Sequence, residues 1–474
     1  MKKRSVLIVG LTATLLMSAC GANDSGGGDE ESTDVTTTTT APAGDAKVMF
    51  GDLDSPCGKD IDGTTVTVKA DQAGGSPDAL RIGIANERAS TIRPGLLQEM
   101  YDAGTAFVQW CNAQGGIGGL PLEAVDLDGK LLQVEQAMAT ACTGTFALVG
   151  GGWVQDNLMY SGKDGSDFHK CKLIAFPGFA VSTDVAEGNG ILQPIPNPAY
   201  IKPSNWIVQL VKLFPEEMKK TTVVWGNIPS LKANKDQIYG VGKTVAGFGA
   251  VDGVSYDGIG QPDWSLVAQQ VKDTGATAVS FVGEPQNLSK LSQALKAQDY
   301  TGPIFADANQ YDQILIDTSG PEAVEGVITR QAFHPFEEAD KWPGIEAFDK
   351  MMETYNPTGK VAALSLQATS ALLLFATAAR DCAKGSGGEI SRDCVMKAGF
   401  AIKDWTAGGL HAATQPSSKK PGECALLLQV QGGKYVRLDP ELDDPDAVDG
   451  FFCSPIAEIT GDLGTGNIDP TRAY

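Results

Sequence analysis

Short apolar runs alternate with longer amphipathic segments along most of the chain, and this alternation limits the fold more than any other feature of the sequence. A first series gives strands at residues 80–85, 122–127, 146–149 and 173–176, and helices at 95–112, 131–142 and 157–168. After a break near 197–203, a second series gives strands at 222–225, 251–256, 278–282 and 304–306, and helices at 235–247, 264–274 and 288–298. Such alternation is typical of βαβ units and parallel sheets. We therefore expect an α/β chain with two lobes of similar build.

The last third of the chain follows a different pattern. It predicts a strand at 327–333, helices at 347–355 and 362–383, and a hairpin formed by 425–430 and 435–438. The helix at 362–383 is long and apolar enough to raise the question of a membrane span. Ser365, Gln367 and Thr369 interrupt its apolar surface. We therefore predict a helix in the core of an α/β protein.

The first 20 residues have the pattern of an export signal. Lys2, Lys3 and Arg4 precede an apolar run at 6–17, and small residues lead into Cys20. The run is too short for a bilayer core that needs roughly 20 residues. The position of Cys20 resembles the lipobox of bacterial lipoproteins, which implies a lipidated cysteine and a protein anchored to the outer face of the cell membrane. An ordinary cleaved signal, in which Cys20 has no role, is the alternative.

Residues 21–47 are rich in glycine, serine, threonine and acidic residues, and we expect a flexible tether. The chain as a whole is acidic, with 58 acidic and 37 basic residues and a net charge of −21. Removal of the three basic residues of the signal brings the charge to about −24. This balance argues against binding to nucleic acid or to anionic lipid surfaces, because both require basic patches.

Nine cysteines indicate disulfide bonds in an exported chain. Eight remain beside Cys20, and eight cysteines allow 105 pairings, so the sequence alone leaves the pairing open. Cys382 and Cys394 form the best local pair, because a Gly/Ser-rich turn lies between them. The eight are Cys57, Cys111, Cys142, Cys171, Cys382, Cys394, Cys424 and Cys453.

Catalytic and metal-binding motifs are missing from the sequence. It contains no GxSxG, HExxH or GxxxxGK[ST] motif and no CxxC pair, and the three histidines at 169, 334 and 411 are scattered. We therefore predict no catalytic residues, no metal and no cofactor. The alternative is a secreted hydrolase that uses carboxylates such as Glu284 and Asp307.

Several motifs together resemble a known family. Residues 106–122, with the sequence AFVQWCNAQGGIGGLPL, resemble the N-x-x-GGI-x-G-x-x-[IL] signature of type I periplasmic binding proteins. These include leucine/isoleucine/valine-binding proteins and their amide- and urea-binding relatives. Residues 146–151 and 173–178 resemble the third and fourth strands of that family. Residues 239–242 (YGVG) and 263–265 (DWS) resemble the starts of second-lobe helices. The resemblance covers roughly residues 80–440.

The resemblance implies two Rossmann-like lobes with parallel central sheets and three crossings between the lobes. It places residues 80–196 and 331–410 in lobe 1 and residues 197–330 and 425–440 in lobe 2. Residues 48–79 are then an N-terminal extension, and residues 441–474 a C-terminal tail packed on the surface. The family binds a small ligand in the cleft at the carboxyl ends of strands and delivers it to an ABC permease in the membrane. A ligand sensor of the same fold, without a transport role, is the alternative.

The resemblance also implies a ligand site. Main-chain N–H groups after the third and fourth strands would meet the ligand, and a tyrosine and polar residues of the second lobe would complete the site. Alternatively, the glycines at these positions are present only because the turns require them, and the acidic residues are helix N-caps or solvated loop residues. Trp153, Phe179 and Ala180 depart from the pattern of amino-acid binders, so we expect an amino acid, an amide, or an aromatic or cationic metabolite rather than a simple branched-chain amino acid. The predicted contacts are Gly151, Gly152, Trp153, Gly178, Phe179, Ala180, Tyr239, Glu284, Asp307 and Asn309.

Overall fold

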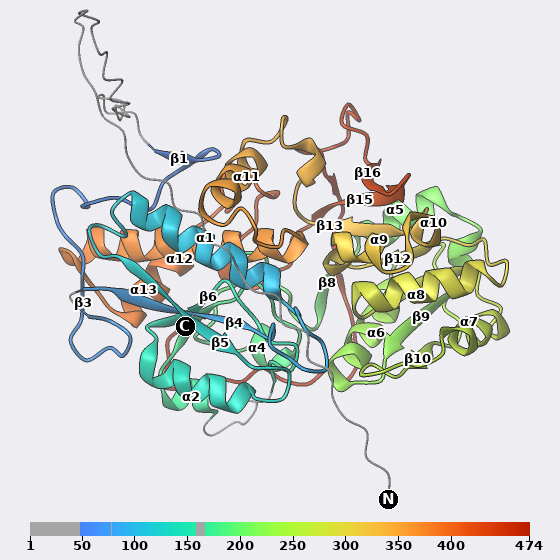
Figure 1. Cartoon of the computed structure of the whole chain (residues 1–474), viewed down its shortest axis with the longest axis horizontal. Helices are drawn as coiled ribbons and strands as arrows, with labels where there is room; N and C mark the ends of the chain where they lie inside the picture. The colour runs from blue at the N-terminus through green and yellow to red at the C-terminus, as the bar shows by residue number, and fades with distance from the viewer. Residues whose placement is uncertain (1–47, 77, 158–165) are drawn as a thin grey trace, which may run out of the picture. The chain divides into compact units, whose positions relative to one another are not determined.

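A computed structural model describes residues 48–76, 78–157 and 166–474, and it contains two separate large sheets (Figure 1). The first sheet has the order β5-β4-β6-β7, and all its neighbouring strands are parallel. Its strands are β4 (Leu80–Asn86), β5 (Leu122–Asp128), β6 (Ala147–Val149) and β7 (Ile174–Phe176). We call this sheet and the helices packed on it the first lobe. The predicted α/β class with parallel sheets is confirmed.

The second sheet has eight strands and defines the second lobe. Its order is β10-β9-β11-β12-β13-β15-β16, and β17 pairs with β15. The first five strands are parallel, whereas β15 is antiparallel to β13 and β16 is antiparallel to β15. The strands are β9 (Thr221–Gly226), β10 (Val254–Tyr256), β11 (Ala278–Val282), β12 (Ile304–Ala306), β13 (Ile328–Gln331), β15 (Cys424–Gln431), β16 (Lys434–Asp439) and β17 (Phe452–Cys453).

Helices cover both faces of each sheet, because side chains on both faces of these parallel strands are apolar. On the first sheet, Ile82 and Phe176 join the core under α1 and α12, while Ala85 and Leu148 join the core under α2. The first-lobe helices are α1 (Gln98–Ala113), α2 (Val134–Gly144), α11 (Pro343–Tyr355), α12 (Ala363–Ser386) and α13 (Arg392–Ala401). The second-lobe helices are α5 (Asn205–Leu213), α6 (Pro229–Gly242), α7 (Trp264–Asp273), α8 (Pro285–Lys296), α9 (Gln313–Ser319) and α10 (Pro321–Val324).

Short elements complete the described chain. Two short helices are α3 (Asp167–Lys170) and α4 (Thr183–Ala186). The 3-10 helices are η1 (Glu217–Lys220), η2 (Ala308–Gln310), η3 (Phe336–Glu338) and η4 (Pro416–Ser418). Small two-stranded sheets pair β1 (Met49–Phe50) with β2 (Leu53–Asp54), β3 (Thr67–Val68) with β14 (Glu389–Ile390), and β8 (Ile201–Pro203) with β18 (Ile456–Glu458).

The long apolar helix α12 lies in the core of the first lobe. Among the described residues it is the one helix whose length and composition would suit a membrane span, and 89% of its apolar window is buried. Leu366, Leu373 and Phe375 pack in the core between α1 and the first sheet. The prediction of a core helix is therefore confirmed.

Four disulfide bonds use all eight cysteines that follow Cys20. They are Cys57–Cys111, Cys142–Cys171, Cys382–Cys394 and Cys424–Cys453. The predicted local pair joins α12 to α13, and Cys57–Cys111 fastens the segment before the first sheet to α1. The signal, Cys20 and the predicted tether at 21–47 lie outside the described residues, as does most of the helix predicted at 157–168.

The end of the chain contains more regular structure than a surface tail. Within residues 441–474, β17 pairs with β15 of the large sheet and β18 pairs with β8. The chain then returns to the first lobe, where the Asn467 carbonyl accepts a hydrogen bond from the Asn189 N–H and contacts a ring nitrogen of His169 at 2.9 Å. This C-terminal passage, residues 459–474, adds to the three crossings between the lobes that the family resemblance implies.

Candidate functional site

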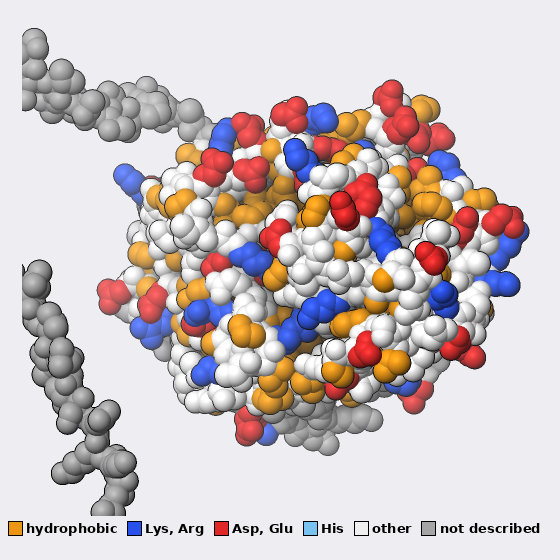
Figure 2. Space-filling view, turned by 45° about the vertical axis from the view of Figure 1, so that its right-hand side comes forward, with side chains coloured by type: hydrophobic (Ala, Val, Ile, Leu, Met, Phe, Trp, Pro, Cys, Tyr) orange, Lys and Arg blue, Asp and Glu red, His pale blue; other side chains and the backbone are white. Residues whose placement is uncertain are grey.

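A cavity of about 180 Å³ lies between the two lobes, at the carboxyl ends of their strands. The first lobe contributes the loop at 93–97 after β4, the start of α1, and two side chains from the loops after β6 and β7, Val154 and Phe179. The second lobe contributes Glu284 and Gln286 after β11 and residues that follow β12. Figure 2 shows the surface hollowed between the lobes, with basic side chains beside the hollow. The position agrees with the rule that open α/β sheets bind ligands beyond strand carboxyl ends.

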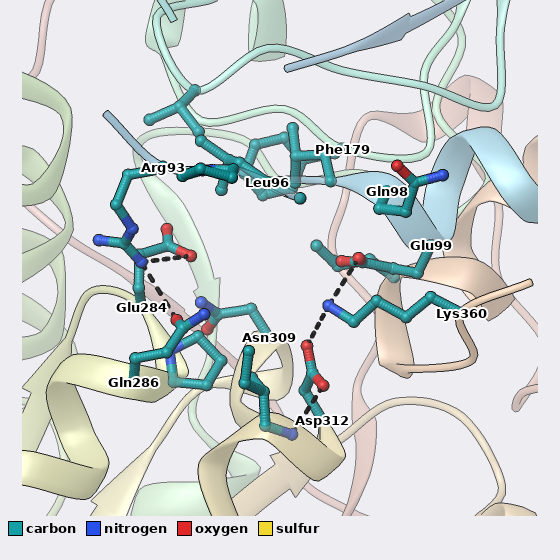
Figure 3. A pocket seen from close by; sticks show the side chains of 17 residues that line it. Arg93, Leu96, Gln98, Glu99, Phe179, Glu284, Gln286, Asn309, Asp312 and Lys360 are labelled. Carbon is teal, nitrogen blue, oxygen red and sulfur yellow. Dashed lines mark hydrogen bonds and ion pairs between the residues drawn. The ribbon is translucent and has the colours of Figure 1, made fainter. Parts of the chain in front are cut away.

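An arginine from the first lobe reaches across the cavity to the second lobe. The Arg93 Nη2 lies 3.4 Å from Glu284 Oε2 and donates a hydrogen bond of 3.2 Å to Gln286 Oε1 (Figure 3). The loop that carries Arg93 turns sharply, with left-handed backbone at Gly95 and Leu97. The side chains of Arg93 and Glu284 are 18% and 27% exposed, so water screens this pair only in part.

A lysine just before α12 joins two carboxylates from different lobes. Lys360 Nζ lies 3.0 Å from Glu99 Oε2 on α1 and 2.5 Å from Asp312 Oδ2, which follows β12 (Figure 3). The two carboxylates are almost completely buried. Burial opposes the charge on Lys360, but the two carboxylates outweigh it and raise the pKa of the lysine. The backbone N–H of Lys360 also donates to the side chain of Asp102 on α1, so both the backbone and the side chain of the lysine are fixed.

Two further carboxylates are buried behind the first-lobe wall. Glu87 Oε2 accepts the N–H of Val154 at 3.3 Å, and Glu87 Oε1 has no hydrogen-bond partner among the described residues. Burial raises the pKa of Glu87 to about 8. Asp156 accepts the N–H groups of Val181 and Ser182 at 2.7 and 2.9 Å, and burial raises its pKa to about 7. Both side chains therefore hold loops that carry the cavity wall.

Three of the predicted contacts line the main cavity: Phe179, Glu284 and Asn309. Gly151, Gly152 and Trp153 line a smaller cavity of about 20 Å³, which Phe179 also borders. Close backbone packing requires both glycines. A Cβ added at Gly151 would lie 2.1 Å from the carbonyl oxygen of Ala85, and a Cβ added at Gly152 would lie 2.7 Å from the carbonyl oxygen of Phe179.

The remaining predicted contacts make other interactions. The Trp153 ring is buried in the first-lobe core, and its Nε1 donates to the Leu127 carbonyl. Gly178 packs against the start of α12, and the carbonyl of Ala180 accepts a hydrogen bond from Asn197. The Tyr239 hydroxyl lies between two backbone groups of its own lobe, and Asp307 pairs with Arg330 at 2.8 Å. In the described part of the chain, the main cavity is therefore not lined by Gly178, Ala180, Tyr239 or Asp307.

Sequence reasoning missed most of the charged side chains of the cavity. The loop after the first strand could have been singled out, because it follows a strand carboxyl end in the same way as Glu284 does. Because the loop lies at that strand end, Arg93 and the start of α1 line the cavity. Lys360 gave no such signal, since it precedes a helix far along the chain. The missed residues are Arg93, Gln98, Glu99, Gln286, Asp312 and Lys360.

A metal centre finds no support in the described residues. Within the ranges 48–76, 78–157 and 166–474, no group of three or more His, Cys, Asp or Glu side chains is placed to hold a metal ion. The two carboxylates considered for a hydrolase serve separate ion pairs, Glu284 with Arg93 and Asp307 with Arg330.

Comparisons with known proteins agree with this architecture. Residues 211–434 match a family model described as periplasmic binding protein. A fatty acid ABC transporter substrate-binding protein from Thermomonospora curvata is similar, with a TM-score of 0.65 at 15% identity over 81% of this chain and 98% of that chain. A leucine-binding protein from Thermotoga maritima gives a TM-score of 0.62 at 15% identity over 76% of this chain and 98% of its own. No curated protein matches the sequence.

A branched-chain amino acid ABC transporter protein from Thermus thermophilus with bound valine is a further similar structure. Its TM-score is 0.61 at 14% identity, over 82% of this chain and 98% of that chain. The chain therefore has the type I periplasmic binding protein fold. In sequence, residues 211–434 carry the pattern of the periplasmic binding protein family, which confirms the resemblance found in the motifs.

Proposed function

We propose that the protein is the extracytoplasmic solute-binding receptor of an ABC importer, which closes on a small ligand between its lobes. The cavity between the two lobes carries this proposal, because both sheets supply its walls and charged side chains bridge it. A volume of about 180 Å³ is below the roughly 300–1,000 Å³ of pockets for drug-sized molecules. The ligand is therefore a small metabolite. Several similar structures are named as substrate-binding proteins of ABC transporters.

The interactions across the cavity hold the two lobes in a closed arrangement. The Arg93–Glu284 pair joins the two lobes directly, and Lys360 links α1 of the first lobe to Asp312 of the second lobe. Separation of the lobes breaks these contacts and exposes the cavity. A ligand that touches both walls favours the closed form by its differential affinity for the two states.

The N-terminus supports anchoring of this receptor outside the cytoplasm. Cys20 follows an apolar run and small residues, and residues 21–47 would tether the folded lobes to a lipidated cysteine. Four disulfide bonds fit an oxidising compartment. A Cys20→Ser variant should then appear in the culture medium instead of the membrane fraction, and should not incorporate a labelled fatty acid. Retention of the variant in the membrane would contradict lipid anchoring.

Ligand binding is tested by thermal shift with amino acids, amides, urea, amines and aromatic acids. A bound solute raises the melting temperature, because it stabilises the folded state alone. Phe179→Ala should weaken binding of that solute about tenfold, since the ring is half-buried in the wall of the cavity. Phe400→Ala is the matched control, because Phe400 packs on Tyr474 away from the cavity. No response to any class of solute would contradict the receptor function.

Transport, sensing and hydrolysis lead to different results. An importer receptor should co-purify with a permease and support uptake of its solute, whereas a sensor should recover a membrane receptor and leave uptake unchanged when deleted. A hydrolase would consume the solute. We expect the bound solute to be recovered unchanged after long incubation.

A further inference from the structure

Several backbone N–H groups of the first-lobe loops already donate hydrogen bonds within the protein. Glu87 accepts the N–H of Val154, and Asp156 accepts those of Val181 and Ser182. The Gly152 N–H donates to the Ala85 carbonyl at 3.0 Å. A ligand carboxylate placed at these loops would therefore compete with Glu87, Asp156 and the Ala85 carbonyl for these donors.

The charges on the cavity wall are unequal. Two basic residues, Arg93 and Lys360, face three acids, and each of the five is in an ion pair with another. Because Lys360 serves both Glu99 and Asp312, the described wall carries one carboxylate more than its basic groups balance. An additional negative charge in this partly closed cavity is unfavourable, and a positive charge is favourable.

The carboxyl group of Glu87 is buried behind the cavity wall. Its Oε1 is fully buried and lacks a hydrogen-bond partner among the described residues. The residues bonded to Glu87, Leu96 through a backbone bridge and Val154 through its N–H, both line the cavity. Burial, with a smaller contribution from nearby Glu284, raises the pKa of Glu87 to about 8, so at neutral pH Glu87 is mostly protonated and the wall charge comes from Glu99, Glu284 and Asp312.

Apolar surface forms the rest of the wall. Leu96, Val154, Phe179, Ile314 and Leu364 contribute it from both lobes. An aromatic ring such as that of Phe179 can attract a cation, and aliphatic side chains can bury a hydrocarbon body. Figure 3 shows Leu96 and Phe179 on one side of the cavity and the ion pairs on the other.

We propose that the cavity binds a small organic cation with an apolar body, such as a branched alkyl amine, and discriminates against ligands that carry a carboxylate. This assignment rests on the proposed receptor function and names its class of ligand. The excess carboxylate of the wall balances the cation, whereas a ligand carboxylate would add to that excess and would compete for the N–H groups of Val154, Val181 and Ser182.

Three probes with the same branched hydrocarbon body test the assignment: 3-methylbutylamine, L-leucine and 4-methylpentanoate. Their affinities for the full-length protein in detergent are measured by calorimetry at neutral pH. We expect the amine to bind at least about tenfold more tightly than either carboxylate-bearing probe. Equal or tighter binding of leucine or 4-methylpentanoate would overturn the assignment, as would the absence of binding by this amine and by its straight-chain homologues.

These outcomes are separate from a failure of the receptor function. A carboxylate-bearing solute that binds leaves the receptor function intact and overturns the ligand class. No binder in any chemical class, and no small molecule released from the purified protein, would overturn the receptor function itself.

A charge variant gives a readout that a change in folding would not produce. Glu284→Gln removes one acid of the wall and leaves Arg93 without its carboxylate partner. The amine should then bind about tenfold more weakly, and 4-methylpentanoate should bind more tightly. Glu346→Gln is the control, because the Glu346 side chain on α11 is 55% exposed and pairs with Lys350. A parallel loss of affinity for both probes in Glu284→Gln would contradict the proposed role of the wall charges.

Discussion

Replacement of Glu87 by glutamine should make the stability of the protein less dependent on pH. Glu87 is fully buried, and burial raises its pKa from an ordinary value of 4.5 to about 8, with smaller contributions from neighbouring acids. The folded state therefore holds a proton on Glu87 more tightly than the unfolded state does. The resulting stability is complete below pH 4.5 and is lost as the pH rises through about 8.

The size of the effect follows from the two pKa values. The interval between 4.5 and about 8 corresponds to roughly 5 kcal/mol at about 1.4 kcal/mol per pH unit. Glutamine resembles the protonated acid, and its carbonyl oxygen still accepts the N–H of Val154. At pH 9 we therefore expect Glu87→Gln to be more stable than the wild type by about 2–5 kcal/mol. At pH 5 the difference should vanish or change sign.

Urea unfolding monitored by circular dichroism, at pH 5, 7 and 9 with the disulfides intact, measures this difference. Asp156 titrates in the same range but is present in both proteins, so its contribution cancels in the comparison. Glu346→Gln makes the same charge change at a side chain that is 55% exposed, and should alter stability by less than about 0.5 kcal/mol at each pH. A difference between Glu87→Gln and the wild type that stays constant from pH 5 to pH 9 would refute the reasoning.

Four further variants test the ion pairs, disulfide bonds and close packing described above. Lys360→Met should destabilise the protein by about 3–5 kcal/mol in urea unfolding, because it leaves two buried carboxylates unpaired; an effect below about 1 kcal/mol would contradict the bridge. Replacement of both cysteines of Cys57–Cys111 by serine should cost about 4 kcal/mol, against about 3 kcal/mol for Cys382–Cys394, since the closed loops span 54 and 12 residues; the reverse order would contradict the loop-entropy argument. Gly151→Ala should lower the melting temperature and abolish solute binding, because the added Cβ would lie 2.1 Å from the Ala85 carbonyl oxygen; unchanged binding would show that the loop can move.

The sequence predicted the elements whose burial leaves a periodic pattern. Strands such as β11 are apolar on both faces, and α7 starts at the predicted Trp264, where Asp263 caps its N–H groups. The helices α5 and α9 were missed. They are short, and α5 begins immediately after the break predicted near residues 197–203.

The candidate site was less predictable than the fold. The family motifs pointed to Phe179, Glu284 and Asn309, because these follow strand ends. Arg93 and Lys360 acquire their roles from partners that are 191 and 48 residues away, at Glu284 and Asp312. No local pattern encodes such pairs, since the folded arrangement of loops alone brings them together. Only the even number of cysteines, and not most of their pairing, could be read from the sequence.

The last residues of the chain set a mechanical limit on the hinge. Ile459 is bonded to Tyr200 beside β8, and Asn467 is bonded to Asn189 of the first lobe. Between these two anchors lie only residues 460–466, of which Leu463 already accepts a hydrogen bond from Thr183, and a fully extended chain spans at most about 3.4 Å per residue. The short segment therefore limits how far the two lobes can separate. The width of the opening through which a solute enters depends on the length of this segment.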